Sequence, residues 1–467
     1  MISITTKPKK GNEMTMQIVP REEEILDPNL PIIERIGKMA RLCYKVESEP
    51  SLDVDCRIIK KCIESGHESI LEHGVISVFI NPEITEDSKR FAQYTKSKTP
   101  FGLRTLWDYA MTDACNKYLE SFHDVDIYDK WKVIHNIDDQ ERKMLPVVVG
   151  DVRAWRQVMR ERFFMSIQQG DKLQYILCLK VLHELDKVDG MHVLFGDLVN
   201  DQNEILQDAE RRKRMLFETE VATDEKGNPV WNVKNIVDFY FKEINTVIAT
   251  TASASASMSV IITTDRATTH QLVRHRKNVA YSQESQRYVN YGKKGCCAVP
   301  MVIDPKKAKD GVKVDPITGE IQEGCPVYDV WKTSVEESFE NYEKLLEMGV
   351  PTESARGVLP NDAKTKIGIT WMRHSGFMNF NFWRLDSHAQ YAIRAMAFRI
   401  VYKAFKMHHQ FMSSVPYNIV MKWLNAMIEQ NVIEDKEDVK KIMKEREQLQ
   451  KLVMEYIQKN KGVPPKK

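Results

Sequence analysis

The sequence predicts a helix-rich α+β protein built around a central mixed or antiparallel sheet. Apolar residues recur at helical spacing in many segments, whereas only two short runs have the composition of strands. These runs are residues 75–80 (VISVFI) and the second half of residues 249–265, which alternates and is rich in small and β-branched residues. The 467 residues are enough for two or three domains.

The first half of the chain is expected to be mainly helical. Residues 31–46 carry apolar residues at helical spacing. Asp53 or Asp55 is expected to cap the next helix, and Gly66 is expected to end it. The strand at residues 75–80 follows. Further helices are expected at residues 108–122, 152–165 and 172–186.

The second half is expected to be helical as well, after a charged linker-like stretch (residues 205–232) that contains the turn signal DEKGNP. A helix should follow the second strand and run through Arg276. Residues 301–326 contain DPKKAKDG and DPITGE, which predict a hairpin-like excursion, and Pro351 suits the first turn of a short helix. Longer helices are expected at residues 235–248, 327–348, 387–408 and 434–458.

The composition argues against several classes of protein. The net charge is only +2, so no global field indicates a nucleic-acid or membrane partner. No stretch approaches the roughly 20 apolar residues of a spanning helix, and the polar N-terminus lacks the apolar core of a signal peptide. A cytoplasmic protein is therefore expected. The eight cysteines include no C-x-x-C pair, so reduced thiols are expected.

The chain also shows signs of an internal repeat. Four pairs of segments match in the same order, namely residues 58–80 with 240–262, 142–146 with 355–360, 151–162 with 373–384, and 173–182 with 389–398. These matches favour a tandem duplication over an unrelated inserted domain with chance similarity. The predicted organisation is an N-terminal extension (1–30), a degenerate first repeat (31–200), a linker (201–234), a second repeat (235–410) and a C-terminal helical extension (411–467).

The segment most informative about function is HQLVRHRKNVAYSQESQRYVNY, residues 270–291. Its cations are interleaved with Ser, Gln and Tyr, so they are not neutralised by Glu at i+4. On a helix, Gln271 and Arg274 share a face. In an extended stretch Ser285 and Arg287 would point the same way and form a cradle for phosphate. The alternative interpretation is a solvated basic face.

RHR followed by a short gap and then S-x-R-Y resembles the signature of the flavin-dependent thymidylate synthase family. The chain has RHR at residues 274–276 and SQRY at residues 285–288, with eight residues between them where the family usually has seven. Three further segments resemble the family in its order, namely GHESILEH (66–73), ESARGVLP (353–360) and NFWRLDSHAQ (381–390). The resemblance covers most of residues 30–410.

This resemblance implies an enzyme that reductively methylates dUMP to dTMP. Methylenetetrahydrofolate would supply the carbon, and FAD reduced by NADPH would supply hydride, without an enzymic nucleophile. Arg384 would polarise the N3/O2 edge of the uracil, because a guanidinium stays charged at any working pH. Ser285 is a weak candidate nucleophile, since no base is evident beside it. The residues implied to bind dUMP are Gln271, Arg274, Gln283, Ser285, Gln286, Arg287, Arg356 and Arg384.

The resemblance also implies a set of residues that contact FAD. They are His67, Ser69, Arg153, Arg274, His275, Arg276, Gln283 and Asn379. No metal is expected, because His67 and His73 are six residues apart and would lie on different faces of a helix. His73 is as readily explained by capping or packing.

The chain departs from the family pattern in the way that the motifs are distributed between the two repeats, which suggests a division of labour. The family usually has Asn-x-Arg where this chain has residues 373–375 (RHS), and the first repeat has DVR there. GHES occurs only in the first repeat and RHR only in the second. Because family members are homotetramers whose sites combine several subunits, we expect a homo-oligomer (a dimer of fused repeats, or a tetramer). His67, Ser69 and Arg153 would serve the flavin, and the second repeat would bind nucleotide.

Other functions are compatible with the same residues. One is a related pyrimidine C5-modifying enzyme, such as a hydroxymethylase or a UMP methylase. Another is an inactive flavin-binding relative, because of the altered segment at residues 373–375. A third, from a different class, is a nucleic-acid-binding module that stacks bases on the Tyr- and Arg-rich run 274–294, which predicts salt-sensitive binding.

Overall fold

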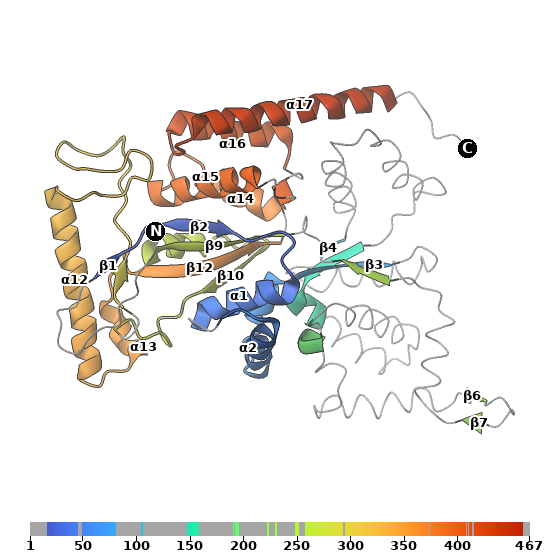
Figure 1. Cartoon of the computed structure of the whole chain (residues 1–467), viewed down its shortest axis with the longest axis horizontal. Helices are drawn as coiled ribbons and strands as arrows, with labels where there is room; N and C mark the ends of the chain where they lie inside the picture. Colours follow the sequence, from blue (N-terminus) through green and yellow to red (C-terminus); the bar gives the residue numbers. More distant parts are fainter. Residues whose placement is uncertain are drawn as a thin grey trace. The chain divides into compact units, whose positions relative to one another are not determined.

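The computed structural model describes residues 16–44, 49–80, 104–105, 147–157, 190, 192–195, 222–223, 229–230, 248–251, 257–292, 295–372, 374–407, 409, 411–412 and 415–460. The chain divides into two compact units that interleave along the sequence. We call them the carboxyl unit (residues 1–26, 41–47 and 259–466) and the central unit (residues 27–40 and 48–258). Each unit combines helices with a four-stranded sheet, which confirms the predicted helix-rich α+β class (Figure 1).

The carboxyl unit is organised around a sheet with the strand order β10-β12-β9-β2. Its strands are β10 (Val279–Gln283), β12 (Lys364–Trp371), β9 (Met258–Asp265) and β2 (Glu22–Ile25). The pairs β10–β12 and β9–β2 are antiparallel. β9 is the strand predicted in the second half of residues 249–265, and six of its eight side chains are buried. The sheet thus presents the end of β9 and the start of β10 to the segment that carries the RHR motif.

Residues predicted to be an N-terminal extension supply two strands of this unit. β1 (Gln17–Ile18) pairs in parallel with β11 (Cys297–Ala298), and β2 pairs with β9. Along β2 the side chains alternate, with Glu23 and Ile25 buried. A run of three glutamates lacks the apolar alternation that marks a strand, so β2 was not recognisable from the sequence.

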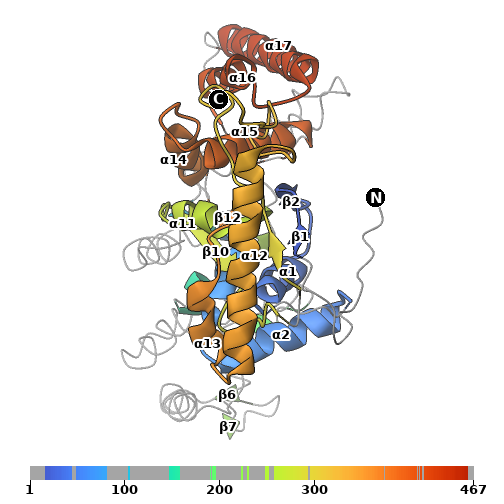
Figure 2. The ribbon, with the colours of Figure 1, turned by 90° about the vertical axis from the view of Figure 1, so that its left-hand side faces the viewer.

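Helices cover one side of this sheet and its end. In Figures 1 and 2, α14 to α17 lie together on one side, and α12 stands beside β1. The bounds are α11 (Arg266–Leu272), α12 (Pro326–Glu347), α13 (Thr352–Ala355), η4 (Arg356–Val358), α14 (His374–Arg384), α15 (Tyr391–Lys406), α16 (Tyr417–Gln430) and α17 (Lys436–Asn460). The helices predicted at residues 327–348, 387–408 and 434–458 are confirmed to within about one turn. α12 contributes Trp331, Phe339 and Tyr342 to a core cluster.

The hairpin-like excursion predicted at residues 301–326 is also confirmed. Isolated bridges pair Val302 with Glu320 and Val314 with Ile321. Arg394 on α15 holds the excursion through an ion pair of 2.9 Å with Asp304. The excursion is therefore packed on the helical layer of the same unit.

The central unit has its own antiparallel sheet, in the order β4-β5-β3-β8. Its helices are α1 (Ile32–Tyr44), of which residues 32–40 belong to this unit, α2 (Leu52–Glu64), η1 (Glu68–His73) and a helical segment at residues 152–157. Its strands are β3 (Val75–Ile80), β4 (Arg104–Thr105), β5 (Val147–Asp151), β6 (Ala222–Thr223), β7 (Pro229–Val230) and β8 (Ile248–Thr251). The predicted helix at residues 31–46 and the predicted strand at residues 75–80 are confirmed. A Cβ on Gly74 would lie within 2.9 Å of Ile32, Ile36 and Val152, so η1, α1 and the helical segment pack closely.

The N-cap of α2 is Ser51, not Asp53 or Asp55 as predicted. Its hydroxyl accepts a hydrogen bond of 3.3 Å from the backbone N–H of Val54, and Gly66 follows the helix with φ +73°. We expect Ser51→Ala to lower the free energy of unfolding by about 1 kcal/mol, the usual loss for an N-cap. Asp53→Ala should cost less, because Asp53 contributes only a charge near the helix N-terminus. Urea denaturation of both variants compares them, and equal losses would contradict the assignment.

Several predictions lie outside the described residues. They include the helices at residues 108–122, 172–186 and 235–248, and most of the linker. The tandem duplication and its boundaries therefore stay predictions, although β3 and β9 are both strands, as the proposed repeat requires. Among the described helices, none is long and apolar enough to cross a bilayer.

Candidate active site

The segment with the cationic cluster begins at α11, which follows β9 directly. Asp265 caps α11, because its carboxylate accepts hydrogen bonds from the backbone N–H of Thr268 at 2.6 Å and from the Thr268 hydroxyl at 2.8 Å. The helix ends at Leu272 and does not continue through Arg276 as predicted. Arg274, His275 and Arg276 therefore lie in a turn beyond the helix.

This turn is fixed at both ends. The hydroxyl of Tyr281 lies 2.7 Å from the carbonyl oxygens of Leu272 and His275. Burial raises the pKa of Tyr281, so the phenol stays protonated and donates. Asn278 has φ +51°, a conformation that asparagine tolerates, and its carbonyl accepts from the N–H of Met372 at 3.0 Å. These hydrogen bonds hold the backbone of the turn that carries the RHR motif in one conformation.

Arg384, at the end of α14, joins this turn from a distant part of the sequence. Its Nε donates to His275 Nε2 at 2.6 Å, and one Nη donates to the carbonyl oxygen of Gln271 at 3.2 Å. Phe380 meets the His275 ring edge to face, with the centroids 5.1 Å apart. The Gln271 side chain bonds to Gln390. Three predicted site residues, from two separate motifs, thus come together.

The charge state of His275 follows from this arrangement. Burial, with a further contribution from the charge of Arg384, lowers the pKa of His275 to about 4. The imidazole is therefore neutral at physiological pH. Since Nε2 accepts from Arg384, the remaining proton is on Nδ1. The pair carries a single positive charge, located on the guanidinium.

A pH dependence follows from the lowered pKa of His275. Between pH about 6.5 and 4 an unfolded chain binds a proton at this histidine and the folded chain does not, so the contribution of His275 to stability is complete above pH about 6.5 and falls as the pH falls. Near pH 4 His275 becomes charged and repels Arg384. We expect His275→Gln, whose amide oxygen can accept from Arg384, to lose stability less steeply than the wild type from pH 6.5 to 4. Urea midpoints across this range test it; parallel curves would contradict it.

Gln283 lies at the end of β10, on the side of the strand that faces α11. Its amide donates to the hydroxyls of Thr269 at 2.8 Å and Thr365 at 3.3 Å. Arg266 bonds to the same Thr365 hydroxyl at 3.3 Å, and also to the carbonyl of Glu284. Arg266 was not among the predicted site residues. The sequence feature that could have indicated Arg266 is its position eight residues before Arg274, at the start of the helix that leads into the RHR motif.

Ser285, Gln286 and Arg287 follow β10 in a turn, not in the extended stretch expected from the sequence. The Ser285 hydroxyl accepts from the backbone N–H of Arg287 at 3.2 Å. Thr352 donates to the carbonyl of Arg287 at 2.8 Å, and Glu353 lies 3.8 Å from its exposed guanidinium. The turn is therefore held against α13.

Arg356 also lies at this edge of the carboxyl unit. Its Nε donates to the carbonyl of Glu353 at 3.0 Å, and its charge contributes to lowering the pKa of Arg266, after burial. Arg287 and Arg356 are both exposed and adjoin the same short helix. Two exposed guanidinium groups thus adjoin one short helix, and guanidinium groups are suited to binding anions.

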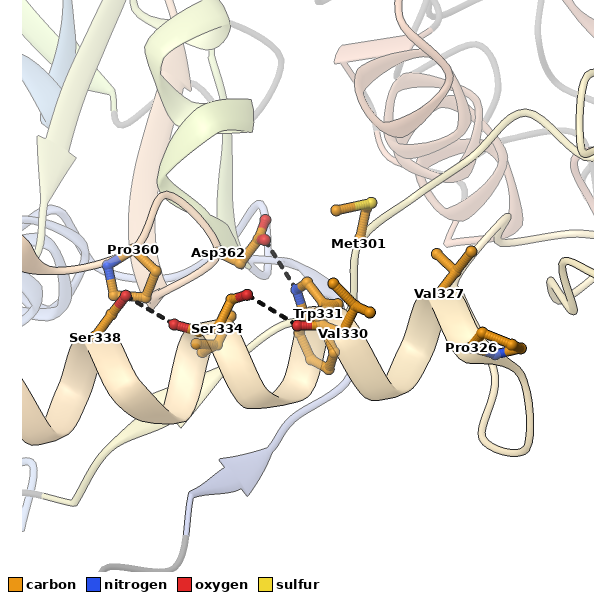
Figure 3. Close-up of a pocket in the computed structure, with 10 residues that line it drawn as sticks. Met301, Pro326, Val327, Val330, Trp331, Ser334, Ser338, Pro360 and Asp362 are labelled. Atoms are coloured by element: carbon orange, nitrogen blue, oxygen red, sulfur yellow. Dashed lines mark hydrogen bonds between the residues drawn. The ribbon is translucent and has the colours of Figure 1, made fainter.

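We call Arg384, Gln271, Gln283, Arg266 and the RHR turn (residues 274–276) the polar cluster. It is distinct from a cavity on α12. This cavity measures about 540 Å³ and is lined mainly by apolar residues of α12, with Met301, Pro360 and Asp362 (Figure 3). Trp331 donates to Asp362 at 2.9 Å beside it. None of the predicted site residues lines this cavity.

Comparison with known proteins gives the family. The chain matches the family model described as Thy1, "Thymidylate synthase complementing protein", over residues 202–408. It is 30% identical over 210 residues to a flavin-dependent thymidylate synthase of Sulfurisphaera tokodaii, and the match covers 45% of this chain and 70% of the relative. The chain belongs to the flavin-dependent thymidylate synthase family.

Other members of the flavin-dependent thymidylate synthase family match shorter stretches. The enzymes so named from Saccharolobus solfataricus and Geobacter sulfurreducens are 36% identical over 143 and 132 residues, which is 31% and 28% of this chain. The chain spans about half the length of these two relatives, 47% and 49%. A solved UMP/dUMP methylase, PolB of Streptomyces cacaoi, bound to 5-Br dUMP, aligns with 18% identity over 42% of this chain and 84% of its own, with a TM-score of 0.27.

The residues matched to the thymidylate synthase family contain the whole polar cluster of the carboxyl unit. Asn379, a predicted flavin contact, is half-buried on α14 between Phe380 and the start of the helix. Arg373 lies outside the described residues, so the altered segment at residues 373–375 is described only at its last two positions. Ser375 accepts a hydrogen bond of 3.4 Å from Asn278, which joins that segment to the RHR turn.

The predicted flavin residues of the first half lie in the central unit, outside the family match. His67 precedes η1, Ser69 lies within it, and both are exposed. Arg153 forms an ion pair with Glu72 of the same short helix. The structure thus brings Arg153 to the GHESILEH segment. Within the part of the chain that is described, no three His, Cys, Asp or Glu side chains form a metal site.

Proposed function

We propose that this protein catalyses the reductive methylation of dUMP to dTMP, using methylenetetrahydrofolate and FAD that NADPH reduces. The proposal rests on family membership and on one geometric observation. The guanidinium of Arg384 is fixed by His275 and Gln271 in a cluster that combines the family motifs. A fixed, permanently charged fork is suited to the imide edge of a pyrimidine.

Arg384 would bind the uracil through the donors that the protein does not use. A guanidinium has five N–H donors, and two of them bond to His275 and Gln271, so three remain. Burial lowers the pKa of Arg384, but a guanidinium starts so high that it stays charged at neutral pH. It would stabilise the negative charge that develops on the N3/O2 edge without exchanging a proton.

The phosphate and ribose of dUMP would be held by the turn after β10. Ser285, Gln286 and Arg287 lie there, and Arg356 adjoins the same edge of α13. The charges of Arg287 and Arg356 suit a dianion, and Glu353 would be displaced from its loose 3.8 Å contact with Arg287. Gln271 lies on α11, Arg274 in the turn beyond it and Gln283 at the end of β10, and these three would contact the rest of the nucleotide.

The residues of the carboxyl unit also fit a flavin dinucleotide. Arg274 and Arg276 are exposed, and neither has an acidic partner among the described residues, so both are available to a pyrophosphate. His275, Gln283 and Asn379 offer neutral polar groups in the same unit. When bound, FAD would carry hydride from NADPH to the one-carbon unit. In the central unit, His67, Ser69 and Arg153 would contribute further flavin contacts.

No side chain of this cluster is arranged as a nucleophile. The Ser285 hydroxyl accepts from a backbone N–H, and in the described part of the site no base lies against it. The protein's role would therefore be to bind, orient and polarise. The natural assembly is proposed to be a homo-oligomer, and sedimentation of the purified protein tests this.

The proposed activity is tested with the purified protein. We expect a yellow protein whose flavin is reduced by NADPH, and which converts dUMP to a product with the mass of dTMP when methylenetetrahydrofolate is present. UMP is the competing substrate in the same assay. A hydroxymethyl product, or turnover of UMP alone, would replace the proposal with a related C5-modifying activity. Flavin reduction without any nucleotide product would indicate an inactive flavin-binding relative.

The division of labour predicts a selective effect of Arg153. We expect Arg153→Ala to weaken FAD binding about tenfold, the loss expected for one charged contact to a phosphate, and to leave dUMP affinity nearly unchanged. Arg57→Ala is the matched control, because Arg57 is exposed on α2 of the same unit and, among the residues that the structure describes, bonds only to the carbonyl of Asp53. Fluorescence titration of the apoprotein with FAD measures both. Unchanged FAD affinity in Arg153→Ala would refute this assignment.

A further inference from the structure

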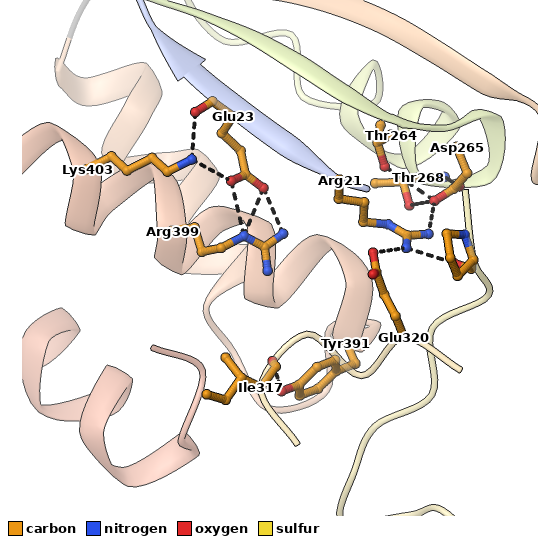
Figure 4. A network of polar contacts seen from close by, with 11 residues as sticks. Arg21, Glu23, Thr264, Asp265, Thr268, Ile317, Glu320, Tyr391, Arg399 and Lys403 are labelled. Atoms are coloured by element: carbon orange, nitrogen blue, oxygen red, sulfur yellow. Dashed lines mark hydrogen bonds and ion pairs between the residues drawn. The ribbon is translucent and has the colours of Figure 1, made fainter. Parts of the chain in front are cut away.

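Arg21, the residue directly before the strand β2, ties the N-terminal segment to the start of α11. One Nη donates to Asp265 at 2.6 Å, and the other donates to Glu320 at 2.8 Å and to the carbonyl of Pro300 at 2.7 Å (Figure 4). The side chain of Arg21 is 7% exposed and that of Asp265 is 3% exposed. A buried guanidinium with three partners from three segments is held in one position.

Arg21 is also the counter-ion of a group of carboxylates. Burial opposes the ionisation of Asp265, but Arg21 and the N–H of Thr268 outweigh burial and hold the pKa of Asp265 below its usual range. Nearby, burial raises the pKa of Asp362, and the charge of Asp265 raises it further, whereas Arg21 lowers it. Without Arg21, the negative charges of Asp265 and Glu320 would face each other with no cation between them.

Asp265 matters because it is the N-cap of α11. The other end of this short helix provides the contacts of the polar cluster: Gln271 accepts from Arg384, and Leu272 accepts from Tyr281. In the middle, Thr269 accepts from Gln283. α11 is short and its contacts lie at both ends, so a shift of its capped end changes the position of each of these groups.

We propose that Arg21 is a positioning residue of the nucleotide site, which acts by fixing Asp265 and thereby the orientation of α11. This inference rests on the proposed function for the identity of the ligand. Arg21 lies far outside the residues 202–408 that match the family, in a part of the chain without a recognisable strand pattern. The N-terminal segment is thereby part of the site's support.

The strand β2, which begins directly after Arg21, offers a matched control. Glu23 is 1% exposed on its side chain and pairs with Arg399 at 2.7 Å and Lys403 at 3.2 Å, both on α15 (Figure 4). Glu23→Gln therefore weakens a buried ion pair of β2 without touching α11. A general loss of stability would affect both variants, whereas loss of position would affect only the Arg21 variants.

The experiment compares Arg21→Met, Arg21→Lys and Glu23→Gln as full-length proteins. We expect Arg21→Met to raise the KM for dUMP about fivefold, as for the loss of one N-cap interaction, with kcat less affected. Arg21→Lys should lie between it and the wild type. Glu23→Gln should lower the Tm and leave the KM within about twofold of the wild-type value. A KM that rises equally in Glu23→Gln, or not at all in Arg21→Met, would overturn the proposal.

Two further measurements keep the inference testable. If Arg21→Met folds poorly, the double variant Arg21→Met/Asp265→Asn removes the charge of Asp265, so that Glu320 no longer faces a second carboxylate. The amide oxygen of the new side chain can still cap α11. This variant should recover folding and part of the KM, and no recovery would contradict the proposal. Hydrogen exchange of the α11 amides in the ligand-free protein should quicken in Arg21→Met and not in Glu23→Gln. This measurement decides the positioning of α11 even if the wild type converts no dUMP, an outcome that would refute only the proposed function.

Discussion

Arg384→Lys is expected to lower kcat/KM for dUMP by about 10²- to 10³-fold, the usual loss when a fixed charge-stabilising donor is removed. A lysine keeps the charge but has neither the planar fork nor an Nε–H that can donate to His275 while the other nitrogens face the substrate. The carbonyl of Gln271 would lose its partner as well. The conservative variant therefore tests the geometry of the guanidinium more than its charge.

The control for this prediction is Arg446→Lys. Arg446 lies on α17 of the same unit, where its guanidinium rests over the ring of Phe405 at 5.0 Å. It should cost stability without lowering the activity, since it contacts no residue of the polar cluster. Steady-state kinetics with saturating folate and NADPH measures both variants. An Arg384→Lys enzyme with more than about a third of the wild-type kcat/KM would exclude the role assigned to Arg384.

The sequence predicted the parts of the fold that depend on local patterns. The spacing of apolar residues located α12, α15 and α17, and the alternating small and β-branched residues located β9. Turn residues located the excursion at residues 301–326. In each of these elements the apolar residues that form the sequence pattern are also the residues that pack on the rest of the unit, because the element buries one stripe or one face.

The parts that failed depend on pairing between distant residues. β2 is EEEI, and it is a strand because it pairs with β9 and because Glu23 meets Arg399 and Lys403. Asp53 and Asp55 are residue types that often cap helices, but the N-cap position of α2 is occupied by Ser51. Such choices are decided by tertiary contacts that no local window contains.

Three of the residues predicted for the candidate site lie together, but the geometry between them was not predicted. The motifs located Gln271, His275 and Arg384, and the structure brings them together. The supporting residues Arg266 and Tyr281 were not predicted, because each acts through hydrogen bonds to the backbone or to a neighbouring hydroxyl. The turn at Ser285 likewise depends on its contact with α13 and not on spacing along a strand.

Gly376→Ala is expected to destabilise the protein by about 3 kcal/mol, at the upper end of overpacking effects, and to abolish most of the activity. Gly376 lies in the first turn of α14, where an added Cβ would lie 2.4 Å from the carbonyl oxygen of Lys277 and 3.2 Å from Asn278. A backbone oxygen cannot rotate away as the end of a side chain can. Alanine is the better helix former by about 1 kcal/mol, but that gain is smaller than the cost of the clash.

The clash would act on the site because it separates α14 from the RHR turn. Asn278 is already held at φ +51° by its bonds to Met372 and Ser375, so the turn has little freedom to withdraw. α14 would have to move instead, and it carries Arg384 away from His275. Loss of the Arg384–His275 bond would then accompany the loss of stability, which distinguishes this variant from an ordinary core defect.

Gly357→Ala is the matched control, since nothing lies within 4 Å of the Cβ that it would add. Restricting the unfolded chain at such a position stabilises a protein by about 0.4–1 kcal/mol, so this variant should be as stable as the wild type or more so. Urea denaturation and dUMP turnover measure both variants. If Gly376→Ala matched Gly357→Ala in both measurements, the close approach of α14 to the RHR turn would not exist in solution, and the proposed support of Arg384 by His275 would fail with it.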